Sequence, residues 1–245
     1  MTNDFDYSVR VKTGASWRNF DRVRLMISVG QEYHEGKKLQ ATVEWINRNP
    51  CIERVHISDN DLLQCHNFIA AGMSSEQAEK VALSAGALWL ARNEETLLQI
   101  RAPIQITRWK DWFNRAQFEV AHRAIKEYAT VDSSFNDSVN EDAGTLAARK
   151  LQRGEPVPPR LVAHSRDYVL EELAVFALQT AELPATEVYP GSNLKSATYL
   201  FGKTSLPEAI QPLARRHFTR IDFSKINVGQ TAGATQHVLR QHALG

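Results

Sequence analysis

The sequence predicts a single α/β domain over residues 1–245, in which a parallel sheet is flanked by helices. Three features lead to this fold class: a strand–helix–strand pattern near the start, a long helical middle, and short strands near the end. A chain of 245 residues with 43% hydrophobic content is long enough to enclose one large core.

The strand–helix–strand pattern is the clearest of these features. The segment 23–28 (VRLMIS) has the pattern of a strand, and a second strand-like segment follows at 52–58. Between them Leu39, Val43 and Ile46 recur at i, i+4 and i+7, which is typical of a helix. A βαβ unit of about 30 residues predicts a right-handed crossover between parallel strands.

The remaining elements follow from capping, periodicity and proline. Ser74-x-x-Gln77 has the form of a capping box and predicts a helix as far as Leu97. Residues 104–109 predict a third strand, and 186–191 and 218–223 predict two more. The pattern is helical over 111–181 except at 154–160, where three prolines preclude a continuous helix. We expect the helix after Ser74 to bury the face formed by Ala78, Val81, Ala85 and Leu88.

Charge and cysteine content narrow the classes of function. The net charge is +1, so a nucleic-acid surface would have to be a local patch. Cys51 and Cys65 have no C-x-x-C spacing, and we expect two reduced, buried thiols. Because Cys65-His66 lacks the paired spacing of a zinc site, we expect no metal. The start of the chain resembles no leader and no segment is apolar enough to span a membrane, so we expect a cytoplasmic protein. We also expect a monomer.

A lone serine, Ser28, ends the first predicted strand. The carboxyl end of a strand in a parallel sheet normally borders a ligand crevice. One interpretation is a serine hydrolase, which would need His34 or His56 as the base and a carboxylate such as Asp59 behind it. Ser28 lacks the G-x-S-x-G elbow of the common hydrolases.

A second alternative is a nucleotide site at Gly202-Lys203-Thr204. The segment 197–204 is similar to a relaxed phosphate loop, in which Lys203 would contact a phosphate. It does not begin with glycine, and the bulky Tyr199, Leu200 and Phe201 disfavour a turn of inward-pointing amides.

Tyr168 and Glu172 form a second candidate site. Their i, i+4 spacing places a phenol and a carboxylate on one face of a helix, where they could hold a small cation. The ordinary alternative is a tyrosine at the edge of the core and a glutamate in water. Glu171 faces elsewhere, and we expect it to be solvated.

The two candidate sites together resemble the tRNA-dependent cyclodipeptide synthases. The resemblance lies in ISVGQEY (27–33) and YVLEE (168–172) and extends from about Arg22 to Tyr189. It implies a Rossmann-like domain similar to the catalytic domains of class I tyrosyl- and tryptophanyl-tRNA synthetases. The implied activity is aminoacyl transfer without a cofactor: two aminoacyl-tRNAs react in turn and yield a cyclic dipeptide, a 2,5-diketopiperazine.

The resemblance also implies roles for single residues. Ser28 is the nucleophile that accepts an aminoacyl group, and Tyr168 and Glu172 hold its ammonium. A later tyrosine assists proton transfer, and both Tyr189 and Tyr199 are candidates. We choose Tyr189, because Tyr189-Pro190 together with Gln31 fits the X-Tyr-Pro branch of the family, whereas Leu200 follows Tyr199. The residues expected to line the substrate site are Arg24, Met26, Gly30, Gln31, Tyr33 and Pro190.

Arg24 and Met26 depart from the family, which commonly has an apolar and a small residue at these positions. Both share a strand face with Ser28. Met26 should shorten the pocket of the first amino acid. Arg24 either pairs with a structural carboxylate or recognises an acidic side chain of the substrate, because a buried guanidinium needs a partner.

The tRNA-binding surface is less defined. Many family members carry an arginine-rich helix where this chain has VALSAGALWLARNEE, which is nearly uncharged before Arg92. We favour Lys37 and Lys38, because they follow the serine closely in sequence. The alternative basic groups are Arg149, Lys150 and Arg153, and Arg215, Arg216 and Arg220.

Overall fold

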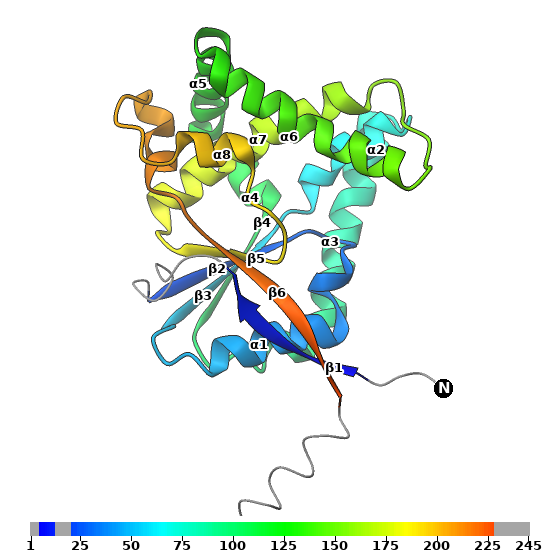
Figure 1. Ribbon diagram of the computed structural model, residues 1–245, viewed down its shortest axis with the longest axis vertical. Helices are drawn as coiled ribbons and strands as arrows, with labels where there is room; N and C mark the ends of the chain where they lie inside the picture. Colours follow the sequence, from blue (N-terminus) through cyan, green and yellow to red (C-terminus); the bar gives the residue numbers. More distant parts are fainter. Residues whose placement is uncertain (1–4, 13–20, 228–245) are drawn as a thin grey trace, which may run out of the picture.

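The computed structural model describes residues 5–12 and 21–227, which form one six-stranded sheet with helices on both faces (Figure 1). Residues 1–4, 13–20 and 228–245 of the expected domain lie outside this description. The sheet has the strand order β1-β6-β5-β2-β3-β4. The strands are β1 (Phe5–Val11), β2 (Arg22–Ile27), β3 (Arg54–Asp59), β4 (Ile104–Arg108), β5 (Thr186–Tyr189) and β6 (His217–Asn227).

Five of these strands are parallel, as the βαβ pattern predicts, and their order is that of a Rossmann-like sheet. The sixth strand, β1, was not predicted. It pairs antiparallel with β6 at the edge of the sheet. An edge strand whose partner lies at the far end of the chain carries little local signal, so the sequence alone did not reveal it.

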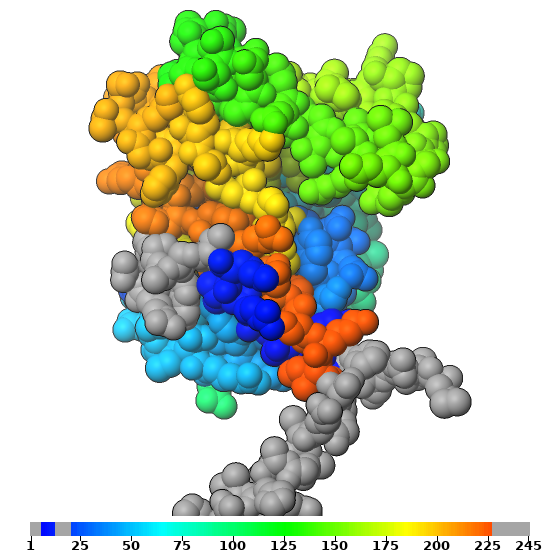
Figure 2. Space-filling model, in the orientation of Figure 1, coloured from blue at the N-terminus to red at the C-terminus, as the bar shows by residue number. Residues whose placement is uncertain are grey.

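The helices at 36–47, 75–97, 116–131, 133–152 and 161–182 lie where the periodicity predicts them, with the break at 154–160 between the last two, whereas those at 65–70 and 195–200 were not predicted. Figure 1 shows α5, α6, α7 and α8 grouped on one side of the sheet and α1 on the other. In the space-filling view these two parts form the upper and lower portions of the molecule (Figure 2). The α-helices are α1 (Gly36–Asn47), α2 (Cys65–Ala70), α3 (Ser75–Leu97), α4 (Trp109–Phe113), α5 (Ala116–Val131), α6 (Ser133–Gln152), α7 (Leu161–Glu182) and α8 (Lys195–Leu200); the 3₁₀ segments are η2 (Glu32–His34), η3 (Leu62–Gln64) and η4 (Glu208–Arg215).

Strand β2 divides the core in two by alternation. Val23, Leu25 and Ile27 pack in one cluster with residues of α1 and α3. Met26 points the other way, into the cluster built by α5, α6 and α7. Because successive side chains on a strand face opposite sides, Ser28, which follows Ile27, lies on the α7 side of the sheet.

Helix α3 buries a different face from the expected one. Its capping box at Ser74 and Gln77 is present. However, Val81 is 40% and Leu88 is 63% exposed. The residues that α3 buries are Ala78, Ala82, Gly86, Trp89, Asn93 and Leu97. An added Cβ at Gly86 would lie 2.5 Å from the Asp61 Cβ, so a glycine there permits the close approach of the helix.

Two further expectations about the whole chain can be compared with the structure. Cys51 and Cys65 are both free thiols, but Cys51 is exposed and Cys65 only half-buried, so the expectation of buried thiols was wrong. Within residues 5–12 and 21–227, none of the helices combines the length and the apolar character that crossing a membrane requires.

Candidate active site

Ser28 and Tyr189 lie at the switch point of the sheet. Ser28 directly follows β2, and Tyr189 is the last residue of the neighbouring strand β5. Beyond β2, the parallel strands β3 and β4 follow toward one edge of the sheet, and beyond β5, strand β6 follows toward the other edge. In open α/β sheets, ligands bind outside the carboxyl ends of the strands at this point.

A chain of three hydroxyl groups begins at Ser28. Its Oγ lies 3.0 Å from the Tyr189 hydroxyl, which lies 2.7 Å from the Tyr33 hydroxyl. The Tyr33 and Tyr189 rings meet edge to face with centroids 5.7 Å apart. Burial is the main cause that raises the pKa of both phenols above its ordinary value. Both tyrosines are therefore protonated at neutral pH and act as hydrogen-bond donors or proton relays, not as bases.

The turn that carries Ser28 is fixed by its backbone. The Ser28 amide donates to His34 Nδ1 at 2.9 Å, and the Gln31 amide donates to the Ser28 carbonyl at 3.2 Å. Gly30 has φ +84°, a conformation that disfavours any residue with a Cβ. Burial lowers the pKa of His34 to about 3, so its imidazole is neutral and accepts this hydrogen bond.

The geometry does not support the serine hydrolase. His34 Nδ1 accepts a hydrogen bond from the backbone amide of Ser28, whereas the Ser28 hydroxyl is hydrogen-bonded to Tyr189 and not to His34. His56 is bound to Arg24 Nε at 3.0 Å and to Thr107 Oγ1 at 2.7 Å. Neither Asp59 carboxylate oxygen has a hydrogen-bond partner, so no carboxylate–histidine–serine relay is formed.

Tyr168 and Glu172 are close enough to the hydroxyl chain to affect its titration. The charge of Glu172 contributes to the raised pKa of Tyr33, Tyr168 and Tyr189. Burial raises the pKa of Glu172 itself to about 8, with the charge of Glu187 acting in the same direction. The carboxylate expected at Glu172 is thus a neutral carboxylic acid in the unliganded site, and because the side chain is half-buried, the alternative of a glutamate in water is wrong.

A buried ion pair lies near Glu172. Arg216 donates from Nε to Glu187 Oε2 at 3.1 Å, and its guanidinium lies 4.0 Å from the centroid of the Phe176 ring. Arg216 and Glu187 are both nearly inaccessible, and their charges act on the pKa of Glu172 in opposite directions. Arg216 is therefore a buried structural residue, and its assignment to a tRNA-binding patch was wrong.

Glu171 is also buried, contrary to expectation. It accepts from Trp109 Nε1 at 2.7 Å and lies 2.9 Å from His66 Nε2. Helix α7 is packed by α2, α5 and α6. A helix surrounded on several sides has little solvated surface, so helical geometry alone did not predict the environment of Glu171.

Tyr199 and the Gly202-Lys203-Thr204 segment lie elsewhere. The Tyr199 hydroxyl donates to Asp132 at 2.9 Å, and Lys203 lies over the Tyr199 ring at 3.9 Å. Residues 197–200 belong to the short helix α8 and not to a loop after a strand. The phosphate-loop alternative therefore lacks the strand–loop–helix context that it requires.

Arg24 is held by protein groups. It is 1% exposed and donates to His56 and to the carbonyl oxygens of Gln179 and Leu183, at 2.8 and 2.6 Å. Burial lowers its pKa to about 10, while the charge of Glu187 raises it. These contacts favour a structural role for Arg24 over recognition of an acidic substrate. Its hydrogen-bonded partners are carbonyls and an imidazole, and not the structural carboxylate that was expected. Met26, the other position that departs from the family, is 2% exposed and packs in the cluster built by α5, α6 and α7.

The basic residues named for tRNA binding differ in their surroundings. Lys37 lies 3.3 Å from Asp6, and Lys38 pairs with Glu32. Arg149, at the end of α6, is exposed and its charge acts on the pKa of Tyr33. Arg149 is therefore the candidate basic group with a direct electrostatic link to the site.

Comparison with known proteins agrees with the fold that this geometry indicates. No protein-family model and no curated protein matches the chain. Among solved structures it is similar to a CDPS from Fluoribacter dumoffii, with a TM-score of 0.81, 23% identity, and coverage of 91% of this chain and 100% of the other. The chain has the fold of the cyclodipeptide synthases.

Two further structures extend this likeness. A Mycobacterium tuberculosis protein, described as showing that cyclodipeptide synthetases are related to type I tRNA synthetases, has a TM-score of 0.67 at 16% identity, covering 89% of this chain and 94% of its own. A cyclodipeptide synthase from Candidatus Glomeribacter gigasporarum bound to Phe-tRNAPhe has a TM-score of 0.62 at 20% identity, covering 83% and 87%. The similarity of this fold to class I synthetases agrees with the sequence-based expectation.

Two residues shape the site in ways that were not predicted from the sequence. His34 was weighed only as a base, yet it anchors the serine turn. Gly191 was not singled out, yet an added Cβ there would lie 2.4 Å from Tyr189 Cε1. Its position two residues after a candidate catalytic tyrosine was the available signal.

Proposed function

We propose that this chain joins two aminoacyl groups, delivered by tRNA, into a cyclic dipeptide through an acyl group on Ser28. The observation that carries the proposal is the hydroxyl of Ser28, 3.0 Å from that of Tyr189 at the switch point of the sheet, with the half-buried carboxyl of Glu172 close enough to act on the pKa of Tyr189. The shared fold, which covers 91% of the chain in the Fluoribacter dumoffii comparison, supports it.

The first step transfers an aminoacyl group from tRNA to Ser28. The Ser28 oxygen attacks the ester carbon, the bond to the ribose oxygen breaks, and that oxygen takes the serine proton by way of Tyr189. One ester replaces another, so no energy source beyond the charged tRNA is needed. The Ser28 amide donates to His34, which leaves the amides of Val29 and Gly30 to stabilise the developing oxyanion.

The second step uses the amino group of the bound residue. Tyr168 and Glu172 hold this group, and Glu172 takes its proton so that the amine attacks the ester of a second aminoacyl-tRNA. The bond to the ribose oxygen of the second tRNA breaks, that oxygen takes a proton, the deacylated tRNA leaves, and a dipeptide remains esterified to Ser28. Its terminal amine then attacks the Ser28 ester, which closes the six-membered ring and frees the serine.

The sequence also bears on the branch and the substrate pocket. Gln31 and Tyr189-Pro190 support the X-Tyr-Pro branch of the family. Gly30, Tyr33 and Met26 border the first amino acid, and Met26 limits the length of its side chain.

Incubation with a full pool of charged tRNAs, followed by mass spectrometry for diketopiperazines, tests the proposal. We expect at least one cyclic dipeptide, which disappears when the tRNA is deacylated beforehand. Turnover of simple esters without RNA, and no cyclic product, would identify a hydrolase instead.

A further inference from the structure

A cluster of metal-ligating side chains lies outside the proposed active site, between α2 and α7. His66 comes from α2, and His164 and Asp167 come from α7. One potential ligand atom from each of the three lies within 4.8 Å of the others. Asp167 follows His164 by three positions, which places both on one face of the helix.

His66 is already oriented by a second carboxylate. Its Nε2 lies 2.9 Å from Glu171 Oε2, and Glu171 is in turn fixed by the indole of Trp109 at 2.7 Å. This contact leaves the Nδ1 lone pair of His66 available. A histidine that binds a metal commonly donates its other ring nitrogen to a carboxylate, which fixes the tautomer and the ring orientation.

Access and donor type define what this cluster would bind. The side chain of His66 is 18% exposed, His164 is half-buried and Asp167 is exposed, so an ion can enter from solvent. Two imidazoles and one carboxylate favour a transition metal over Mg²⁺ or Ca²⁺, which prefer oxygen ligands. Three protein ligands leave a position for water.

We propose that His66, His164 and Asp167 form a binding site for a divalent transition-metal ion such as Zn²⁺, with Glu171 as the residue that positions His66. The ion ties α2 to α7 beside Tyr168, whose ring centroid is 6.3 Å from that of His66. The site takes no part in the proposed acyl transfer. The expectation of no metal rested on spacing along the sequence, and His66 lies far from His164 and Asp167 in the sequence.

Equilibrium dialysis of the full chain against Zn²⁺, with bound metal measured by mass spectrometry, tests this site. We expect one saturable equivalent and a rise in unfolding temperature on Zn²⁺ addition. His164→Gln and Asp167→Asn should each lower the affinity by at least the roughly tenfold that loss of an outer-shell partner costs, and should abolish the thermal shift.

Two variants serve as controls. His122→Gln alters a half-buried histidine of the neighbouring helix α5, and Cys65→Ser removes the thiol next to His66. Both should keep the wild-type affinity. The proposal is overturned if Zn²⁺ does not bind saturably, if both His164→Gln and Asp167→Asn bind as wild type does, or if Cys65→Ser loses the site. None of these measurements involves tRNA, so their outcome is independent of the proposed activity.

Discussion

Glu172 carries a carboxyl group that burial keeps protonated until a cation arrives. Its pKa of about 8 means that the unliganded site holds a neutral acid at pH 7. An ammonium brought next to it restores the ionised form, because an opposite charge favours the charged state. Under the proposed function, this one side chain would select for a free amino group.

Replacement Glu172→Gln tests this role with two substrates. Acylation by an aminoacyl-tRNA with a free amine should slow by about 10- to 100-fold, the effect of losing a hydrogen bond to a charged group worth ~1.5–3 kcal/mol. Acylation by the same tRNA with an N-acetylated amino acid should be equally slow in both proteins. Equal losses on the two substrates would assign Glu172 a structural role.

Asp59 is another carboxyl group whose pKa is raised, and it affects stability. It is 0% exposed, and burial, with the charge of Asp61, raises its pKa to about 7. Between pH 4 and 7 the folded state keeps a proton that the unfolded state loses. The contribution of Asp59 to the free energy of unfolding therefore falls as pH rises through this window.

The variant Asp59→Asn removes this titration. Its free energy of unfolding relative to wild type should increase from pH 5 to pH 8 by on the order of a few kcal/mol, measured by denaturant titration. The difference cancels the opposite contributions of His34 and His56, which are the same in both proteins. Asp132→Asn is the control: hydrogen bonding from the Phe135 amide lowers the pKa of Asp132, so its effect should be constant over this range. A pH-independent effect of Asp59→Asn would contradict the account.

At the scale of single elements, the segment after β5 positions Tyr189, the tyrosine proposed to transfer the proton. Because a Cβ at Gly191 would overlap the Tyr189 ring at 2.4 Å, Gly191→Ala should displace the phenol from Ser28. We expect diketopiperazine formation to fall by tenfold or more, about the contribution of one well-placed hydrogen bond in a transition state. The measurement is the initial rate with charged tRNA.

Gly144→Ala in α6 is the matched control. Nothing lies within 4 Å of the Cβ it would add. A glycine-to-alanine change inside a helix should raise the free energy of unfolding by about 0.5–1 kcal/mol and leave the rate unchanged. If Gly191→Ala is as active as Gly144→Ala, the position of Tyr189 does not depend on Gly191.

Elements with local periodicity could be predicted from the sequence, and those that depend on distant partners could not. Leu39, Val43 and Ile46 mark α1 by themselves, and all three are buried as expected. Strand β1 requires β6, and the buried face of α3 depends on Gly86 meeting Asp59 and Asp61. Small residues such as alanine and glycine do not distinguish one face of a helix from another.

The features of the candidate site also divide into those that local sequence predicts and those that depend on distant residues. Ser28 and the Tyr168/Glu172 pair follow from short motifs, because a strand end and an i, i+4 spacing are local features. The protonation state of Glu172 and the burial of Glu171 depend on residues from several helices and strands, such as Glu187, Arg216 and Trp109. No single stretch of sequence contains that information.

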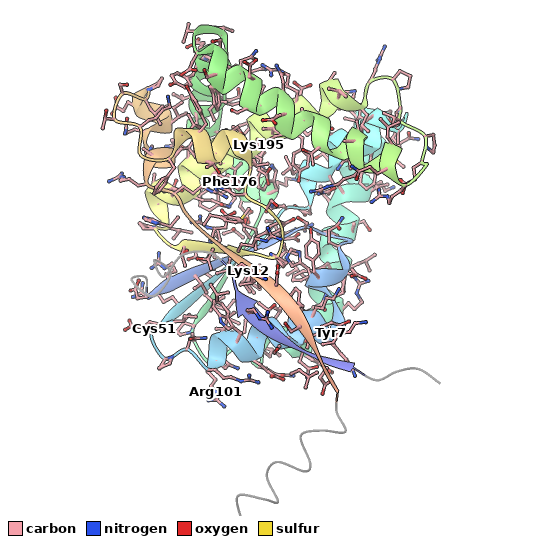
Figure 3. All side chains as sticks on the ribbon, viewed as in Figure 1. Tyr7, Lys12, Cys51, Arg101, Phe176 and Lys195 are labelled. Carbon is pink, nitrogen blue, oxygen red and sulfur yellow. The ribbon has the colours of Figure 1, made fainter. Side chains whose placement is uncertain are left out.

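At the scale of the whole molecule, the carboxyl ends of the parallel strands and the end of α6 share one region, whereas Arg101 precedes β4 at the opposite end of the sheet. Figure 3 shows Arg101 and Cys51 far from Phe176 and Lys195. Because the charge of Arg149 acts on Tyr33, we expect tRNA phosphates to reach the site past the end of α6. Because the net charge of the chain is only +1, attraction of tRNA depends on local basic groups such as Arg149.

Salt dependence of tRNA binding separates these two arginines. Arg149→Gln should weaken binding and reduce the slope of log affinity against log salt concentration by about one, because one phosphate contact is lost. Arg101→Gln, which removes the same charge from the opposite end, should leave the slope unchanged. Equal slopes for Arg149→Gln and wild type would exclude the end of α6 as a contact surface.

The central claim is that Ser28 becomes acylated, and intact-protein mass spectrometry after brief exposure to aminoacyl-tRNA measures this directly. We predict that wild-type protein gains the mass of one amino acid minus water. We also predict that Ser28→Ala shows no adduct and no cyclic dipeptide while keeping its unfolding temperature. An aminoacyl adduct that persists in a folded Ser28→Ala variant would contradict the account, because the nucleophile would then lie elsewhere.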